Sequence, residues 1–217
     1  AEWEEELSRL EIVHQWDKDL PGCLYIPRPQ ELKRLEAPFR EAYYAQDKAS
    51  QWCCAALGAL PGEKVADVCA APGGKSLTIA QYMENCGRLL SGDVHEHKCR
   101  AMRQRFREAS VTISEVVQRD ASAPCKDDER DAFDRVLCDV PCSGLGVIRR
   151  KPEIRYRPLE DLNSLPPLQY QILEQSAQLV RPGGVLQYST CTLNPAENEA
   201  VTERFLNTHP EYEPLTL

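Results

Sequence analysis

Two of the ten cysteines, Cys142 and Cys191, stand where a side chain could perform covalent chemistry. Each closely follows an expected strand, at residues 133–139 and 185–189, and each has a serine or threonine beside it. Because the carboxyl ends of parallel strands meet at one edge of a sheet, we expect the two thiols to converge there. A thiolate at such an edge is a candidate nucleophile, and a structural role for either cysteine is the plain alternative.

The other eight cysteines mostly fall within expected strands or helices, where a cysteine is usually a small buried apolar residue. No two cysteines are separated as Cys-x-x-Cys, and no signal peptide opens the chain. We therefore expect a reducing, cytoplasmic setting rather than a disulfide framework. A zinc site built from Cys138, Cys142 and Cys191 competes with the nucleophile interpretation, but no nearby histidine completes it.

Three aspartates, Asp93, Asp120 and Asp139, end or follow three successive expected strands. The segment at residues 67–75, named the glycine turn below, follows the first strand and reads DVCAAPGGK. Its small residues let the backbone approach a ligand, and a carboxylate at Asp93 suits two ribose hydroxyls. The turn matches neither the dinucleotide-binding nor the phosphate-binding glycine pattern. The group predicts a nucleoside without a polyphosphate, although each aspartate alone could be a helix cap or turn residue.

Short apolar runs alternate with helical patterns from about residue 64, which indicates a mostly parallel sheet flanked by helices. We expect an α/β, Rossmann-like fold over residues 46–217, preceded by a small, incomplete lead-in region at residues 1–45. The expected strands are 65–69, 88–92, 111–117, 133–139 and 185–189, and the expected helices are 75–83, 95–107 and 166–180. Pro182-Gly183-Gly184 is expected to end the helix at 166–180, and residues 194–197 to begin a last one, with Asn194 as cap. Residues 123–131 are expected to form a loop.

The composition fits a soluble globular protein of 217 residues, with 42% hydrophobic residues and no apolar run of the roughly 18 residues that cross a bilayer. The acidic opening and the missing initiator methionine suggest a piece of a longer protein. A net charge of −8 argues against a nucleic-acid partner, but residues 149–157 carry five basic groups and one acid. This basic segment could contact phosphates or could be a solvated turn.

Three motifs carry a resemblance to a known family. The stretches DVCAAPGGK, DVPCSGLGVIRRKPEIRYR and YSTCTLNPAENE occur in that order and resemble the Sun-type RNA cytosine-5 methyltransferase family. The resemblance spans residues 46–212 and is strongest for the bacterial branch that methylates small-subunit ribosomal RNA. That family usually carries a helical RNA-binding domain upstream, which this chain lacks. The resemblance implies RNA, ribosomal in the nearest branch, as the partner, and no membrane.

The resemblance also implies S-adenosylmethionine as the methyl donor, S-adenosylhomocysteine as the product, and no metal. The glycine turn would hold the amino-acid portion of the cofactor. Asp93 would take the ribose hydroxyls, Asp120 would lie by the adenine, and Asp139 by the methionine end and the target base. The residues implied in the turn are Cys69, Ala70, Ala71, Pro72, Gly73, Gly74 and Lys75.

Cys191 matches the family's nucleophile and Cys142 the cysteine that helps release the product. A thiolate that adds to C6 of cytosine makes C5 nucleophilic, and a protonated Asp139 could promote this by bonding to N3. The C5 proton must then leave before the thiolate can be eliminated. The target base must be unstacked to reach such a pocket. The basic residues that could hold flanking phosphates are Arg149, Arg150, Lys151, Arg155 and Arg157.

Three alternatives stay open at this point. The substrate could be tRNA. A methyltransferase of the same fold could act on a protein or a small molecule, with structural cysteines. An inactive cofactor-binding module is a third possibility, against which the paired strand-end cysteines weigh.

Overall fold

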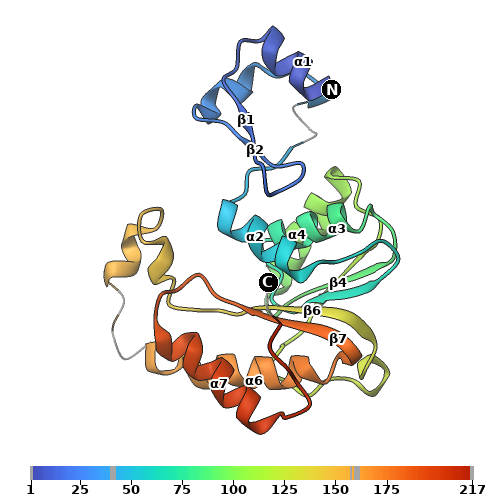
Figure 1. The fold of residues 1–217 in the computed structure, drawn as a ribbon, viewed down its shortest axis with the longest axis vertical. Coiled ribbons are helices and arrows are strands. Elements are labelled where there is room, and N and C mark those ends of the chain that lie inside the picture. The colour runs from blue at the N-terminus through green and yellow to red at the C-terminus, as the bar shows by residue number, and fades with distance from the viewer. Residues whose placement is uncertain (1, 40–42, 157, 159–161, 216–217) are drawn as a thin grey trace.

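A parallel five-stranded sheet forms the centre of the computed structural model, which describes residues 2–39, 43–156, 158 and 162–215 (Figure 1). Its strand order is β5-β4-β3-β6-β7, which confirms the expected mostly parallel α/β fold. The bounds are β3 Lys64–Asp67, β4 Arg88–Asp93, β5 Ser114–Gln118, β6 Phe133–Asp139 and β7 Val180–Ser189. The chain starts in the middle of the sheet, runs outward to β5 and then crosses to β6. Ligands bind at such a reversal, beyond the carboxyl ends of the strands.

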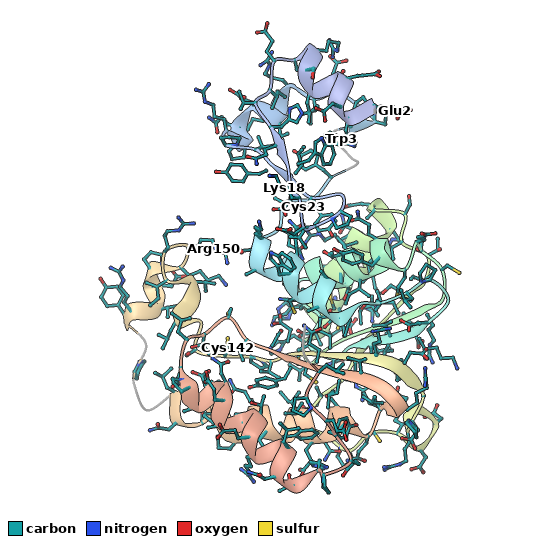
Figure 2. All side chains as sticks on the ribbon, in the orientation of Figure 1. Glu2, Trp3, Lys18, Cys23, Cys142 and Arg150 are labelled. Atoms are coloured by element: carbon teal, nitrogen blue, oxygen red, sulfur yellow. The ribbon has the colours of Figure 1, made fainter. Side chains whose placement is uncertain are left out.

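The N-terminal residues form a separate lobe above α2 (Lys48–Leu57), as Figure 2 shows with Trp3, Lys18 and Cys23 labelled. It contains α1 (Glu2–Arg9), the short antiparallel pair β1 (Gln15–Trp16) and β2 (Leu24–Tyr25), and the 3-10 helix η1 (Pro29–Arg34). Leu7, Ile12 and Leu35 give the lobe a small core of its own. An ion pair of 2.5 Å between Asp17 and Lys48 ties it to α2. The division at residue 45 stays a prediction.

Helices cover both faces of the sheet. On one face lie α2, α3 (Gly74–Tyr82) and α4 (Glu96–Glu108), and on the other α6 (Leu165–Ala177) and α7 (Glu199–Thr208) (Figure 1). Alternate residues of a strand point to opposite faces, so neighbours in β6 serve different cores. Leu137 packs with α2 and α3, whereas Val136 and Cys138 pack with α6 and α7.

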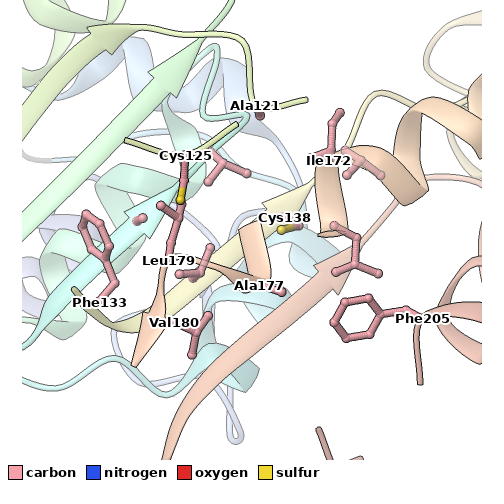
Figure 3. Close-up of a cluster of buried hydrophobic side chains, with 14 of the residues drawn as sticks. Ala121, Cys125, Phe133, Cys138, Ile172, Ala177, Leu179, Val180 and Phe205 are labelled. Carbon is pink, nitrogen blue, oxygen red and sulfur yellow. The ribbon is translucent and has the colours of Figure 1, made fainter. Parts of the chain in front are cut away.

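The core under α6 and α7 is the larger of the two, and Figure 3 shows part of it. Phe133 and Cys138 of β6 are fully buried there beside Leu179, and Phe205 of α7 closes the cluster. Burial of apolar surface stabilises the folded state by about 25 cal/mol per Å², so this packing stabilises β6 and β7. Both cysteine-bearing loops begin where these two strands end.

The structure differs from the sequence prediction around residues 178–184. The helix ends at Ala177 rather than 180, and Pro182 lies inside β7 instead of ending a helix. Val180 pairs with Phe133 and Val185 with Arg135, so four residues of β7 oppose one residue of β6. Proline lacks an N–H and is tolerated at such an irregularity on an edge strand.

Smaller differences fall at element ends. The third strand begins at Ser114 rather than 111, and the expected loop at 123–131 contains the short 3-10 helix η3 (Asp127–Glu129). Asn194 does cap a turn, accepting from the Ala196 N–H at 3.2 Å, but that turn is the 3-10 helix η6 (Pro195–Glu197) and α7 begins after it. In the described part of the chain, no helix has the length and apolar character needed to cross a membrane.

Candidate active site

The glycine turn joins β3 to α3 at the carboxyl edge of the sheet and is fastened from several sides. Asp67 is buried and accepts from the Ser76 hydroxyl at 2.7 Å, and burial raises the pKa of Asp67 to about 7. The Ala70 N–H donates to the Gly92 carbonyl at 2.7 Å. Gly73 has φ +94°, and a Cβ there would lie 2.9 Å from the Phe106 ring. The turn therefore needs glycine to pass so close to α4 and to begin α3.

Asp93 and Asp120 differ in their surroundings. Asp93 is buried at the end of β4, where Oδ1 accepts from the His95 N–H at 2.9 Å and lies 3.8 Å from Lys98 Nζ. Asp120 is exposed and accepts from the side chain and N–H of Ser122, which together lower its pKa. The helix-cap or turn role that each aspartate could have is thus present at both positions. In these hydrogen bonds each of the two aspartates accepts through Oδ1.

Asp139, at the end of β6, lies between two hydrogen-bond donors. Lys75 Nζ from α3 donates to Oδ2 at 2.6 Å, and the Ser189 hydroxyl from β7 donates to Oδ1 at 2.6 Å. Burial alone would lower the pKa of Lys75, but the charge and hydrogen bond of Asp139 raise it above its ordinary value. Asp139 thus joins β6 to α3 and to β7 at the carboxyl edge of the sheet. Its role beside the target base stays a prediction.

Cys142 and Cys191 meet as the topology predicts. Their sulfur atoms lie 3.1 Å apart, and the Cys191 N–H donates to Cys142 Sγ at 3.2 Å. Cys191 is exposed and Cys142 is partly buried. The hydrogen bond with the Cys142 thiol lowers the pKa of Cys191 to about 6, against the effects of burial and of Asp139, with help from Lys75 and Lys151. The same bond and burial raise the pKa of Cys142. The geometry thus supports a Cys191 thiolate beside a Cys142 thiol.

Cys138 does not join them. It is fully buried in the core under α6, and burial raises its pKa to about 12. The zinc alternative from Cys138, Cys142 and Cys191 has no geometric support. In the described ranges, no group of three or more histidine, cysteine, aspartate or glutamate side chains is placed to hold a metal ion.

Sequence reasoning missed the polar groups beneath the two cysteines. Glu197 lies three residues after the Asn194 cap, and its side chain is fully buried and accepts from the Ser143 N–H at 2.8 Å. The Ser143 and Thr192 hydroxyls, also buried, lie 2.6 Å apart. Each of these residues neighbours a singled-out cysteine or the Asn194 cap. That adjacency was the available signal, but only the tertiary structure shows that they meet.

The basic segment follows the Cys142 loop and the 3-10 helix η4 (Leu145–Val147), and it contains the 3-10 helix η5 (Pro152–Tyr156). Arg149, Arg150, Lys151 and Arg155 are all exposed, and Arg157 lies outside the described residues. Arg150 forms an ion pair of 2.6 Å with Asp47, the residue that caps α2. Figure 2 shows Cys142 near the base of this segment and Arg150 toward α2. The segment therefore places cations around the cysteine pair.

Comparison with known proteins agrees with this geometry. The family described as 16S rRNA methyltransferase RsmB/F matches the chain over residues 54–217. A probable ribosomal RNA small subunit methyltransferase B of Bacillus subtilis is 42% identical over 78% of this chain and 38% of its own length. Ribosomal RNA small subunit methyltransferase B of Vibrio cholerae is 33% identical over 97% of this chain and 48% of its own.

Two solved structures are also similar to this chain over most of its length. The crystal structure of PH0851 superposes with a TM-score of 0.89 at 32% identity, covering 99% of this chain and 49% of that protein. NSun6 from Pyrococcus horikoshii, solved with SFG, has a TM-score of 0.72 at 30% identity and covers 80% and 44%. The chain thus spans less than half the length of the relatives compared here.

Proposed function

The chain belongs to the 16S rRNA methyltransferase RsmB/F family, and from this premise we propose that it is the catalytic part of an RNA cytosine-5 methyltransferase acting on ribosomal RNA. One observation carries the proposal. A thiol pair 3.1 Å apart, with the lowered pKa on Cys191, lies at the same sheet edge as the Lys75–Asp139 ion pair. Covalent activation of a base needs a thiolate and a proton donor at one place, and this edge supplies both.

S-adenosylmethionine fits the nucleoside half of the edge and would supply an electrophilic methyl group. The fit rests on Asp93, which is buried at the end of β4 and accepts through Oδ1 in the contacts of the described residues, so that Oδ2 can accept from a ribose hydroxyl. Residues 69–75 would hold the amino-acid portion and Asp93 the ribose hydroxyls, with Asp120 near the adenine. The SFG in the NSun6 structure is an analogue of this cofactor, which supports the assignment. We propose no metal.

The chain's own residues would act on the base in three steps. The Cys191 thiolate adds to C6 of cytosine, while N3 takes up a proton that Lys75 delivers through Asp139. The C5 carbon, now part of an enamine, accepts the methyl group. Cys142, after losing its own proton to solvent, then takes the C5 proton, directly or through water. The electron pair of that C–H bond restores the C5–C6 double bond as the C6–sulfur bond breaks to regenerate the Cys191 thiolate, and N3 returns its proton through Asp139 to Lys75.

The basic segment would bind the RNA phosphates on either side of the flipped cytosine. Arg149, Lys151 and Arg155 are exposed, and Arg150 is held toward α2 by Asp47. Such contacts fix the position of the strand without reading its sequence. We extend the proposal to Arg157 on the sequence alone.

The test uses the full-length protein with ribosomal RNA transcripts that contain 5-tritiated cytosine. Methylation at C5 expels that hydrogen, so tritium should appear in water in proportion to methyl groups incorporated from labelled cofactor. Transcribed tRNA serves as the competing substrate. Methyl incorporation without tritium release would place the methyl group elsewhere and refute the cytosine-5 assignment. Preference for tRNA would overturn the ribosomal assignment.

A further inference from the structure

Glu197 is a buried carboxylate that no step of the proposed reaction uses. Its side chain is fully buried between the Cys142 and Cys191 loops. Oε2 accepts from the Ser143 N–H at 2.8 Å and from Gln169 Nε2 at 3.0 Å, and Oε1 accepts from Asn194 Nδ2 at 2.9 Å. Burying a carboxylate is costly unless it is hydrogen-bonded, and here both carboxylate oxygens accept hydrogen bonds.

All three neighbours of the carboxylate are donors, and each belongs to a different element. Ser143 follows Cys142, Asn194 follows Cys191 by three residues, and Gln169 lies on α6. Gln169 Nε2 also donates to the Pro141 carbonyl at 2.9 Å, so both residues that flank Cys142 are held by one small network. Burial would raise the pKa of Glu197, but the hydrogen bonds from these donors lower it below its ordinary value.

The same network reaches Cys191 by a second path. The Ser143 and Thr192 hydroxyls share a hydrogen bond of 2.6 Å, and the Gly146 N–H donates to the Cys191 carbonyl at 3.0 Å. A Cβ on Gly146 would lie 2.9 Å from that carbonyl oxygen, so the two loops pass in close contact. The 3.1 Å sulfur separation is therefore supported by groups below the thiols, in addition to the Cys191 N–H that donates to Cys142 Sγ at 3.2 Å.

We propose that Glu197 is a positioning residue that holds the Cys142 loop, through the Ser143 N–H, in the place from which Cys142 releases the methylated base. This inference rests on the proposed function and goes beyond it by naming what aligns the second cysteine. Glu197 bonds to the residue next to Cys142, whereas its bond on the other loop is to Asn194, three residues from Cys191. Its loss should therefore affect release more than the first covalent step.

The decisive variant is Glu197→Gln. It keeps the volume but offers an amide donor to a site where all three partners donate, so one pair must separate. In the full-length protein we expect the first-turnover methyl transfer to stay within about threefold, whereas steady-state turnover falls by about 10–100-fold. Methylated RNA should then accumulate as a covalent complex on a denaturing gel. Glu197→Asp keeps the charge and should restore part of the turnover.

Glu63→Gln is the matched control. Glu63 accepts two hydrogen bonds from Arg135 and one from the Leu60 N–H at the opposite end of the sheet. We expect it to change thermal stability without changing the ratio of first-turnover to steady-state rates. If Glu197→Gln does not fold, Gln169→Leu removes donors from the same network and should shift the ratio in the same direction.

The outcomes separate the two proposals. Equal losses of the first turnover and of steady state in Glu197→Gln, or a shift equal to that of Glu63→Gln, would overturn the positioning role. Absence of any tritium release or covalent complex in the unmutated protein would instead refute the cytosine-5 function.

Discussion

The two cysteine loops and the basic segment follow the carboxyl ends of β6 and β7 but are built differently. The loops are held from below by Glu197, Ser143 and Thr192, all buried. The basic segment is held by one buried apolar side chain, Ile154, and by an exposed ion pair between Arg150 and Asp47. Bond making needs atoms fixed to fractions of an ångström, whereas phosphates tolerate adjustable cations. The difference fits the proposal that the cysteine loops perform the chemistry and the basic segment contacts RNA.

The largest effect should come from the rigid part. Cys191→Ala removes the nucleophile, so methyl transfer and covalent RNA complex should both disappear, with a rate loss of roughly 10⁴-fold or more. Cys142→Ala removes the group assigned to the later step, so above about pH 8.5, where Cys191 ionises without its help, methyl transfer should proceed once and the enzyme should stall on methylated RNA. A denaturing gel with labelled cofactor distinguishes the two variants. A covalent complex in Cys191→Ala and none in Cys142→Ala would reverse the roles assigned here.

The pH dependence of Cys191 ionisation gives a second test of the cysteine pair. Its pKa is lowered to about 6, so the reactive thiolate should form as the pH rises through about 6 and be fully present above it. Cys142→Ala removes the main cause, so the midpoint should move toward the ordinary thiol value of about 8.5 and alkylation at pH 6 should slow more than about tenfold. Peptide mass spectrometry after iodoacetamide treatment measures the alkylation rate of Cys191 without RNA, and the exposed Cys86 serves as an internal reference. An unmoved midpoint would mean that Cys142 does not stabilise the thiolate.

The proposed cofactor site combines a buried aspartate, Asp93, with an exposed one, Asp120, so we expect effects of intermediate size there. Asp93→Ala should weaken S-adenosylmethionine binding by about 1–3 kcal/mol, the cost of a charged hydrogen bond left unmade. Asp93→Asn keeps an acceptor for the His95 N–H, so this variant distinguishes loss of that hydrogen bond from loss of the ribose contact. Asp120→Ala, at an exposed position, should cost less than about 1 kcal/mol. Equal affinity of the Asp93 variants and the unmutated protein in calorimetry would contradict the ribose assignment.

The sequence was sufficient for the sheet and for the meeting of the two cysteines, because strand ends in a parallel sheet share an edge. It was insufficient where long-range contacts decide. Pro182 looked like a helix stop because local propensity cannot see the irregular pairing with β6. The ion pair of Asp139 depends on Lys75, which is 64 residues away. The buried contact of Glu197 could not be predicted, because the Ser143 N–H that donates to it is 54 residues away.

The smallest effects should come from the basic segment, where charges are exposed and screened. If Arg155 contacts an RNA phosphate, Arg155→Glu should weaken RNA binding and reduce the slope of log affinity against log salt by about 1. Arg150→Glu should do less to the slope, because Arg150 already pairs with Asp47 at 2.6 Å. Cofactor affinity should not change in either variant. Unaltered RNA binding at low salt would assign the segment to a solvated turn.

Asp47→Asn tests whether the ion pair competes with RNA. Asparagine caps a helix about as well as aspartate, so the hydrogen bond to the Ala49 N–H at the start of α2 should be kept. Removing the charge frees Arg150, and exposed ion pairs are worth about 0.2–1 kcal/mol, so RNA binding should strengthen about 1.5- to 5-fold. Fluorescence anisotropy at two salt concentrations measures this, and the gain should vanish in the Asp47→Asn, Arg150→Glu double variant. A gain that persists there would mean that Asp47 repels RNA on its own, and that the basic segment is not restrained by Arg150.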